Sequence, residues 1–172
     1  RIIHGNYQLG PEKQVPQASG VTYSNLYMLD NEGGRIYNFF RGRGWNPNMV
    51  SSDDRGESWT DPVMIFLSGD DSTRPYVKYA SDNTGRIHLL YTDGHPRNEP
   101  LNNVYHVYYE DGAFYDSRGK KLRDLESLGN EPLAPGEGTL VYDGSGPLGR
   151  GWVHDLELSA YGILAGAFIS SA

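Results

Sequence analysis

One phrase occurs twice in the chain and constrains its fold more than any other feature. Each copy has an apolar and aromatic run, a polar turn, the tripeptide Gly-Arg-Ile and a second run. The copies span residues 23–40 and 75–91, and their isoleucines, Ile36 and Ile87, are 51 residues apart. A weaker third copy covers residues 152–169, at an offset of 76 residues from the second. Self-similarity of this kind indicates a repeat architecture in which each unit packs on its neighbours.

Each full unit contains four short runs of β-branched and aromatic residues, separated by turn residues, which is typical of strands. The runs are residues 21–29, 35–41, 49–52 and 63–67 in the first unit, and 76–80, 86–91, 104–109 and 113–115 in the second. Four antiparallel strands repeated at about 40–50 residues are typical of a β-propeller blade. A β-sandwich is the alternative, although it does not require a repeated phrase.

The chain is long enough for only part of such a propeller. Propellers close with about 4–8 blades, whereas 172 residues at a period of 51 give about 3.4 units. We therefore expect an all-β fold with about three blades of a larger propeller, whose remaining blades belong to the same protein. The expected divisions are a lead-in strand and linker over 1–20, a blade over 21–69, a blade over 70–137 with a long insertion at 117–137, and the start of a further blade over 138–172.

Charge and composition exclude several classes of function. The chain has 15 basic and 22 acidic residues, a net charge of −7, which excludes a nucleic-acid module that depends on bulk positive charge. It has no cysteine, so it has no disulfide, thiolate metal site or cysteine nucleophile. Its longest apolar or glycine run, residues 162–169, is far shorter than the ~18–20 residues of a membrane helix. No spacing of residues predicts a metal or another cofactor, and we expect neither a nucleic-acid partner nor a membrane span.

Residues 52–59 match the Asp-box pattern, Ser-x-Asp-x-Gly-x-x-Trp, at every defined position. The motif lies between the third and fourth runs of the first unit, where Asp and Gly suit a hairpin turn. We expect this turn to stabilise the fold, with Asp54 capping backbone amides and Trp59 burying its ring. It is not expected to take part in catalysis.

With the repeat and the Asp box together, the sequence resembles the bacterial BNR-repeat-containing proteins, a sialidase-like propeller family. The resemblance extends over residues 21–26, 39–42, 92–96, 104–109 and 151–155. It implies a propeller of about seven blades that acts on carbohydrate, with the ulvan-type polysaccharide lyases as functional cousins. A secreted, periplasmic or cell-surface location is expected from such a function.

Strand topology places one set of residues on a common rim. In a four-stranded meander, the start of the first strand, the connection between the second and third strands, and the link to the next blade lie on one face. The Asp box lies on the other face. Loops on one rim of a rigid scaffold often carry function. The residues expected on this rim are Tyr23, Arg41, Arg43, Trp45, Arg74, Tyr76, His95, Arg97, Arg150, Trp152 and His154.

This rim has the residue types that recognise an acidic sugar. Arginine forks suit carboxylate and sulfate groups, and aromatic rings can stack on sugar rings. The expected partner is therefore an anionic poly- or oligosaccharide. The predicted substrate-binding residues are Arg41, Arg43, Trp45, Tyr76, Arg97, Trp152 and His154. The alternative is a solvated rim whose arginines pair with Asp70, Asp71 or Asp93.

A lyase that cleaves a uronate-containing polysaccharide needs a cation at the sugar carboxylate, a base for the proton beside it, and an acid for the leaving oxygen. Arg74 with Arg41 would neutralise the carboxylate, and Tyr23 would act as acid or base. His95 lies in an irregular Gly/Pro loop, and its ordinary pKa of about 6.5 suits a base near neutral pH. His106, by contrast, lies within a predicted strand and is expected to be a packed sheet residue.

Two other functions remain open from the sequence. A sialidase-like glycoside hydrolase would need paired carboxylates, or a tyrosine nucleophile with an acidic partner, and Asp93 and Asp155 are the candidate rim acids. A non-catalytic glycan-binding propeller would use Trp45, Tyr76 and Trp152 as a stacking platform. Only the lyase releases an unsaturated uronyl product.

Overall fold

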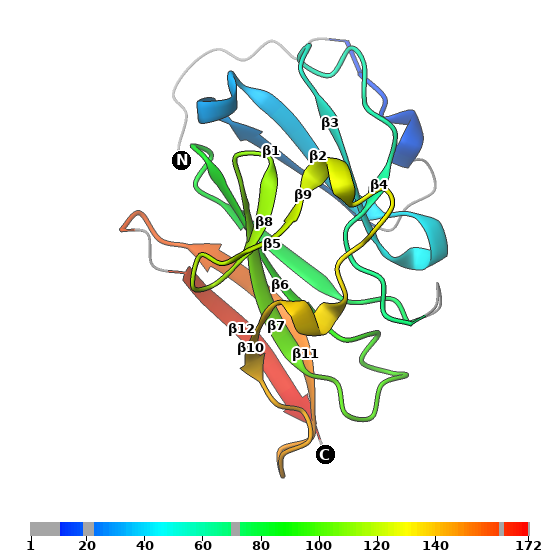
Figure 1. The fold of residues 1–172 in the computed structure, drawn as a ribbon, viewed down its shortest axis with the longest axis vertical. Helices are drawn as coiled ribbons and strands as arrows, with labels where there is room; N and C mark the ends of the chain where they lie inside the picture. The colour runs from blue at the N-terminus through cyan, green and yellow to red at the C-terminus, as the bar shows by residue number, and fades with distance from the viewer. Residues whose placement is uncertain (1–10, 19–22, 70–72, 162–163, 172) are drawn as a thin grey trace.

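The computed structural model describes residues 11–18, 23–69, 73–161 and 164–171. In these residues the regular structure consists of strands and short 3-10 turns, arranged as three antiparallel sheets in chain order (Figure 1). This confirms the all-β prediction. None of the helical turns within those ranges is long and apolar enough to cross a membrane.

The first sheet has the strand order β1-β2-β3-β4 and corresponds to the first predicted blade. Its strands are β1 (Ser24–Leu29), β2 (Arg35–Arg41), β3 (Pro47–Ser52) and β4 (Val63–Met64). The 3-10 turns are η1 (Pro16–Ala18) before the sheet, η2 (Asp30–Glu32) between β1 and β2, and η3 (Arg43–Trp45) between β2 and β3. Successive strands pair as hairpins, which brings the predicted runs side by side in sequence order.

The Asp box forms the connection between β3 and β4, where the sequence predicted it. The Ser52 hydroxyl accepts a hydrogen bond from the Gly56 amide (2.8 Å), and the Asp54 carboxylate accepts one from the Ser58 amide (2.8 Å). Hydrogen bonds from Ser58 and Ser52 lower the pKa of Asp54 to about 2. The Trp59 ring is only half-buried and lies outside the main core. The motif is therefore a self-contained turn rather than an anchor in the core.

The second sheet has the order β5-β6-β7-β8-β9, and β10 also pairs with β7. Its strands are β5 (Val77–Ser81), β6 (Arg86–Thr92), β7 (Val104–Glu110), β8 (Ala113–Asp116), β9 (Lys121–Asp124) and β10 (Thr139–Tyr142). β8 covers the second half of β7, and β10 covers its first half. These two segments together occupy the place of the fourth strand. The register thus groups β10 with the second sheet, whereas the sequence-based division assigned residues 138–172 to the next blade.

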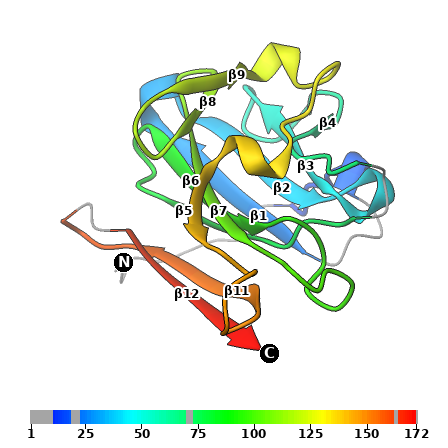
Figure 2. The same ribbon diagram turned by 60° about the horizontal axis from the view of Figure 1, so that its bottom comes forward.

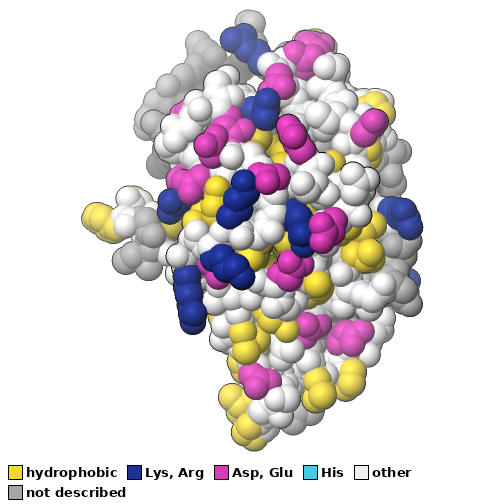
Figure 3. Space-filling model, viewed as in Figure 1, with side chains coloured by type: hydrophobic (Ala, Val, Ile, Leu, Met, Phe, Trp, Pro, Cys, Tyr) yellow, Lys and Arg dark blue, Asp and Glu magenta, His cyan; other side chains and the backbone are white. Residues whose placement is uncertain are grey.

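The long insertion interrupts this fourth strand, and it is more ordered than a polar loop. It contains β9 and the 3-10 turns η4 (Leu125–Ser127) and η5 (Pro135–Glu137). Leu128 and Leu133 are fully buried in the main core, and Leu133 forms a parallel bridge with Phe66 of the first unit. On the face seen in Figure 3, basic and acidic side chains are interspersed. Leu128 and Leu133 therefore fix this otherwise polar insertion against the first sheet.

The third sheet pairs β11 (Arg150–Leu158) with β12 (Leu164–Ser171) and lies beside the second sheet (Figures 1 and 2). β11 packs against β5. A small buried cluster joins these two sheets and includes Leu90, Val104, Val153 and Leu156.

The main core lies between the first and second sheets. It includes Leu29, Tyr37 and Phe39 from one side, and Tyr79 and Leu89 from the other. The rings of Phe39 and Tyr79 have centroids 4.8 Å apart. The apolar faces of successive sheets thus cover one another, and the first strands of the three sheets are β1, β5 and β11.

Candidate functional site

A pocket of about 550 Å³ lies at the end of the sheets where these first strands begin. Tyr23 directly precedes β1, Tyr76 directly precedes β5, and Trp152 is near the start of β11. The repeated phrase thus brings its opening aromatic residues together. The described lining residues are Tyr23, Asn25, Arg41, Tyr76, Val77, Lys78, Tyr79, His95, Arg97, Trp152 and Asp155.

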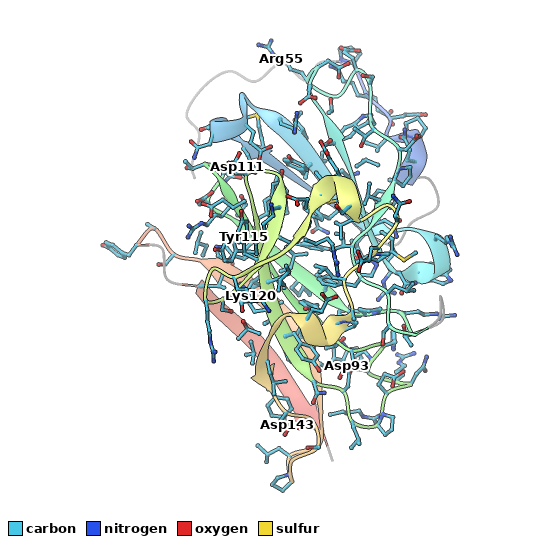
Figure 4. The ribbon with its side chains drawn as sticks, in the orientation of Figure 1. Arg55, Asp93, Asp111, Tyr115, Lys120 and Asp143 are labelled. Atoms are coloured by element: carbon cyan, nitrogen blue, oxygen red, sulfur yellow. The ribbon has the colours of Figure 1, made fainter. Side chains whose placement is uncertain are left out.

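The pocket and the Asp box lie at opposite ends of the sheets. In Figure 4, Arg55 of the Asp box and Asp111 of the β7–β8 turn lie toward the top of the view. Asp93, which follows β6 and precedes the loop that carries His95, lies well below them. This arrangement agrees with the division of rims expected from strand topology.

Six predicted site residues line this pocket: Tyr23, Arg41, Tyr76, His95, Arg97 and Trp152. The other four do not. Arg43 and Trp45 belong to η3, and Arg43 lines a separate hollow. His154 is exposed on β11, with its ring centroid 5.8 Å from that of Trp152. Arg74 is not a lining residue, although its charge acts on His95.

Arg41 is held in the pocket by aromatic rings. Its guanidinium carbon lies 5.1 Å from the ring centroid of Tyr76 and 5.7 Å from that of Tyr23. Both distances are within the usual range for a cation–π contact. Its Nε and one terminal nitrogen are buried and have no hydrogen-bond partner among the described residues. Since buried polar groups nearly always have partners, this guanidinium is suited to receive an anion.

Two further cations line the same pocket without an acidic partner. In the part of the chain that the structure describes, Arg41, Arg97 and Lys78 form no ion pair with a carboxylate. Asp93, one of the expected partners, instead accepts a hydrogen bond from the Asn103 amide (2.7 Å). The other expected partners, Asp70 and Asp71, lie outside the described residues. The pocket therefore concentrates positive charge in a chain of net charge −7.

The loop that carries His95 is fixed by a buried asparagine. The Asn102 side chain accepts a hydrogen bond from the Gly94 amide (3.1 Å) and donates one to the Gly151 carbonyl (2.9 Å). The His95 amide donates to the Thr73 carbonyl (2.7 Å). These bonds connect the loop between β6 and β7 to the segment before β5 and to β11. The position of His95 is thus set by two neighbouring sheets.

The surroundings of His95 favour its neutral form. Burial and the nearby charges of Arg41, Arg97 and Arg74 lower the pKa of the imidazole. Its Nδ1 accepts a hydrogen bond from the Arg97 amide (3.2 Å). In the neutral ring with this contact, the proton is on Nε2 and the basic nitrogen is Nδ1. A substrate proton must therefore compete with the Arg97 amide for Nδ1.

The surroundings of Tyr23 also favour the neutral side chain, but here the pKa shift is upward. Burial raises the pKa of its phenol, although Tyr79 and the charge of Arg41 act in the other direction. Its ring lies against Tyr79, with centroids 6.3 Å apart. A phenol that retains its proton can donate it but is a poor base. Of the two roles predicted for Tyr23, the environment favours that of the acid.

Several lining residues were not predicted as site residues: Asn25, Val77, Lys78 and Tyr79. A signal for two of them exists in the sequence. Asn25 follows Tyr23 by two positions, and Lys78 follows Tyr76 by two, so each shares a strand face with a predicted residue. Within the described ranges, no three His, Asp or Glu side chains are grouped as metal ligands.

Comparisons with known proteins agree with this architecture. The family model described as "BNR repeat-containing family member" matches residues 7–151, and the chain belongs to this family. No curated protein matches the sequence. Among solved structures, the chain is similar to an ulvan lyase, a polysaccharide lyase bound to -[GlcA(1-4)Rha3S]-, with a TM-score of 0.65 and 21% identity. A second structure of ulvan lyase gives a TM-score of 0.64 at the same identity.

In both comparisons the match covers 86% of this chain and 36% of the lyase chain. The chain thus spans about a third of the length of these lyases. At this identity the likeness defines the fold, which is that of consecutive four-stranded blades of a β-propeller.

Proposed function

We propose that this pocket belongs to a carbohydrate-active propeller that cleaves an anionic, uronate-containing polysaccharide by β-elimination. The observation that carries the proposal is that Arg41, Arg97 and Lys78, which line the pocket with His95 and Tyr23, form no ion pair with a carboxylate among the described residues. The similarity to an ulvan lyase bound to a glucuronate-containing sugar supports the proposed lyase function. A polysaccharide substrate also favours a secreted, periplasmic or cell-surface location.

In the proposed reaction, the pocket cations bind the uronate carboxylate and stabilise the negative charge that develops beside it. Nδ1 of His95 accepts the proton from the carbon next to the carboxylate. The electron pair of that C–H bond forms a carbon–carbon double bond as the bond to the glycosidic oxygen breaks. Tyr23 donates its phenolic proton to the leaving oxygen. The products are an unsaturated uronyl end and a free hydroxyl.

The same pocket gives less support to a hydrolase. Hydrolysis by the usual route needs a pair of carboxyl groups across the scissile bond. Among the described lining residues, Asp155 is the only carboxylate. A glycan-binding role without catalysis would use the rings of Tyr76 and Trp152 as a stacking platform, and it would not require His95 and Tyr23 beside the cations.

The test is an assay of the full-length protein on ulvan and on desulfated ulvan, followed by ultraviolet absorbance of the unsaturated uronyl group and by reducing-end formation. The proposal predicts that both signals rise together. Reducing ends without absorbance would indicate hydrolysis, and binding without either signal would indicate a glycan-binding protein. Either of these results would overturn the proposal.

A further inference from the structure

A β-bulge in β11 determines which side chains of this strand enter the pocket. Val153 pairs with Phe168 and Asp155 pairs with Ala167, so His154 is an extra residue without a partner on β12. A bulge of this kind bends the strand and shifts the side-chain alternation by one position. Such bulges are common next to active sites.

The burial pattern shows the consequence of this shift. Val153 and Leu156 are both buried in the cluster between the second and third sheets. Without the extra residue, Asp155 would share the face of Val153, and an unpaired carboxylate would enter an apolar cluster at a large cost. With the bulge, Leu156 takes that place, and Asp155 joins Trp152 in lining the pocket.

Asp155 differs from the other charged residues that line the pocket. It is the only acid among the described ones, and it forms no ion pair with the pocket cations. One of its oxygens, Oδ1, accepts a hydrogen bond from the Leu156 amide (2.9 Å), which fixes the carboxylate. A carboxylate can only accept hydrogen bonds, and sugar hydroxyls are donors of suitable strength. The Trp152 ring, three positions earlier, offers an aromatic face for a sugar ring.

We propose that Trp152 and Asp155 form a subsite for an uncharged, hydroxyl-bearing sugar ring next to the uronate, and that Asp155 determines this specificity. This inference rests on the proposed function, because it assumes that the pocket cations hold the uronate. Asp155 accepts hydrogen bonds from the hydroxyls of the neighbouring ring. It also repels a sulfate at that position, since a like charge placed nearby disfavours the wrong ligand.

The experiment measures binding by calorimetry, so that its outcome does not depend on turnover. The probes are ulvan oligosaccharides and the same oligosaccharides after chemical desulfation. The variants of the full-length protein are Asp155→Asn and, as a matched control, Glu157→Gln. Both changes remove one negative charge from β11, but Glu157 does not line the pocket. Asparagine at position 155 keeps an acceptor for the Leu156 amide, so the fold is retained.

We expect the wild type and Glu157→Gln to bind the desulfated oligosaccharide about tenfold more tightly than the sulfated one, which corresponds to ~1.4 kcal/mol. In Asp155→Asn this ratio should fall to about one. Equal binding of the two probes by the wild type, an unchanged ratio in Asp155→Asn, or the same fall in both variants would overturn the inference. A ratio that changes as expected without any unsaturated product would instead reject the lyase function and leave the subsite in place.

Discussion

The two ends of the sheets differ in how their charged side chains are partnered. At the Asp-box end, Arg35 binds Asp53 and Arg86 binds Glu110 (2.7 Å), each across neighbouring strands. At the pocket end, Arg41 contacts two aromatic rings and forms no ion pair with any carboxylate that the structure describes. Exposed ion pairs such as the former contribute about 0.2–1 kcal/mol each. One end is thus stabilised by ion pairs, whereas the proposed function requires the cations of the other end to remain available for a ligand.

The largest expected effect is on turnover and comes from the pocket end. His95→Ala should lower turnover on a uronate polysaccharide by about 10²–10⁴-fold, the usual contribution of a general base. The melting temperature should change little, because His95 is only partly buried.

His106→Ala is the matched control for this change. His106 is 7% exposed and is hydrogen-bonded to His88 and Ser117 within the second sheet. Its loss should lower stability while the folded protein keeps its turnover. If His95→Ala retained full turnover, the proposed mechanism would be wrong.

At the other end, Trp59→Ala should affect stability and not chemistry. Because the ring is half-buried and lies outside the main core, we expect a loss of about 1–3 kcal/mol in the free energy of unfolding. Denaturant unfolding measures this loss, and turnover per folded molecule should stay constant. An unchanged stability with lost turnover would move the functional site to the Asp-box end.

A smaller effect is expected on the pH dependence of turnover. As the proposed base, His95 has to be neutral, so we expect the rate to fall as pH decreases through its pKa, which burial and neighbouring cations lower. Removing one of those cations in Arg97→Ala favours the protonated ring and raises this pKa. The acid limb of the pH–rate profile should therefore move to higher pH. Arg86→Ala removes a charge that is paired at the other end, and its acid limb should coincide with that of the wild type.

The smallest effect concerns acid stability at the Asp box. The pKa of Asp54 is about 2 in the folded chain, below its ordinary 3.8. A lowered pKa of this kind contributes stability above the ordinary pKa, and the contribution is lost as pH falls from about 4 toward 2. In Asp54→Asn the melting temperature should depend less on pH in this window than in the wild type. An identical dependence in both proteins would show that the hydrogen bonds of the turn do not stabilise the ionised form.

The sequence predicted the parts of the pocket that follow from strand order. Tyr23, Tyr76 and Trp152 open the three copies of the repeat, so a meander has to place them at one end. The sequence could not predict that Arg43 and Trp45, which belong to η3, do not line this pocket. Gly44 (φ 62°) and Trp45 (φ 64°) have left-handed backbone conformations, which form a tight turn between β2 and β3. Strand periodicity carries no information about such a turn.

The sequence also could not predict the register in which the strands pair. β10 pairs with β7 only after the long insertion at 117–137. Leu128 and Leu133 bury this insertion in the main core, but in the sequence they are two leucines in a polar segment. The bulge at His154 likewise changes which face Asp155 occupies, and a period-two pattern cannot show it.

The most direct test of the contrast between the two ends is a calorimetric binding measurement on the wild type, Arg41→Ala and Arg35→Ala. The ligand is a glucuronate-containing oligosaccharide that has no unsaturated uronyl end. A charged hydrogen bond to the sugar carboxylate is worth about 1.5–3 kcal/mol, so Arg41→Ala should weaken binding by roughly 10- to 100-fold. Arg35→Ala, which removes an equal charge from a paired site, should bind within about twofold of the wild type. Equal binding by all three proteins, or an equal loss in both variants, would contradict the account.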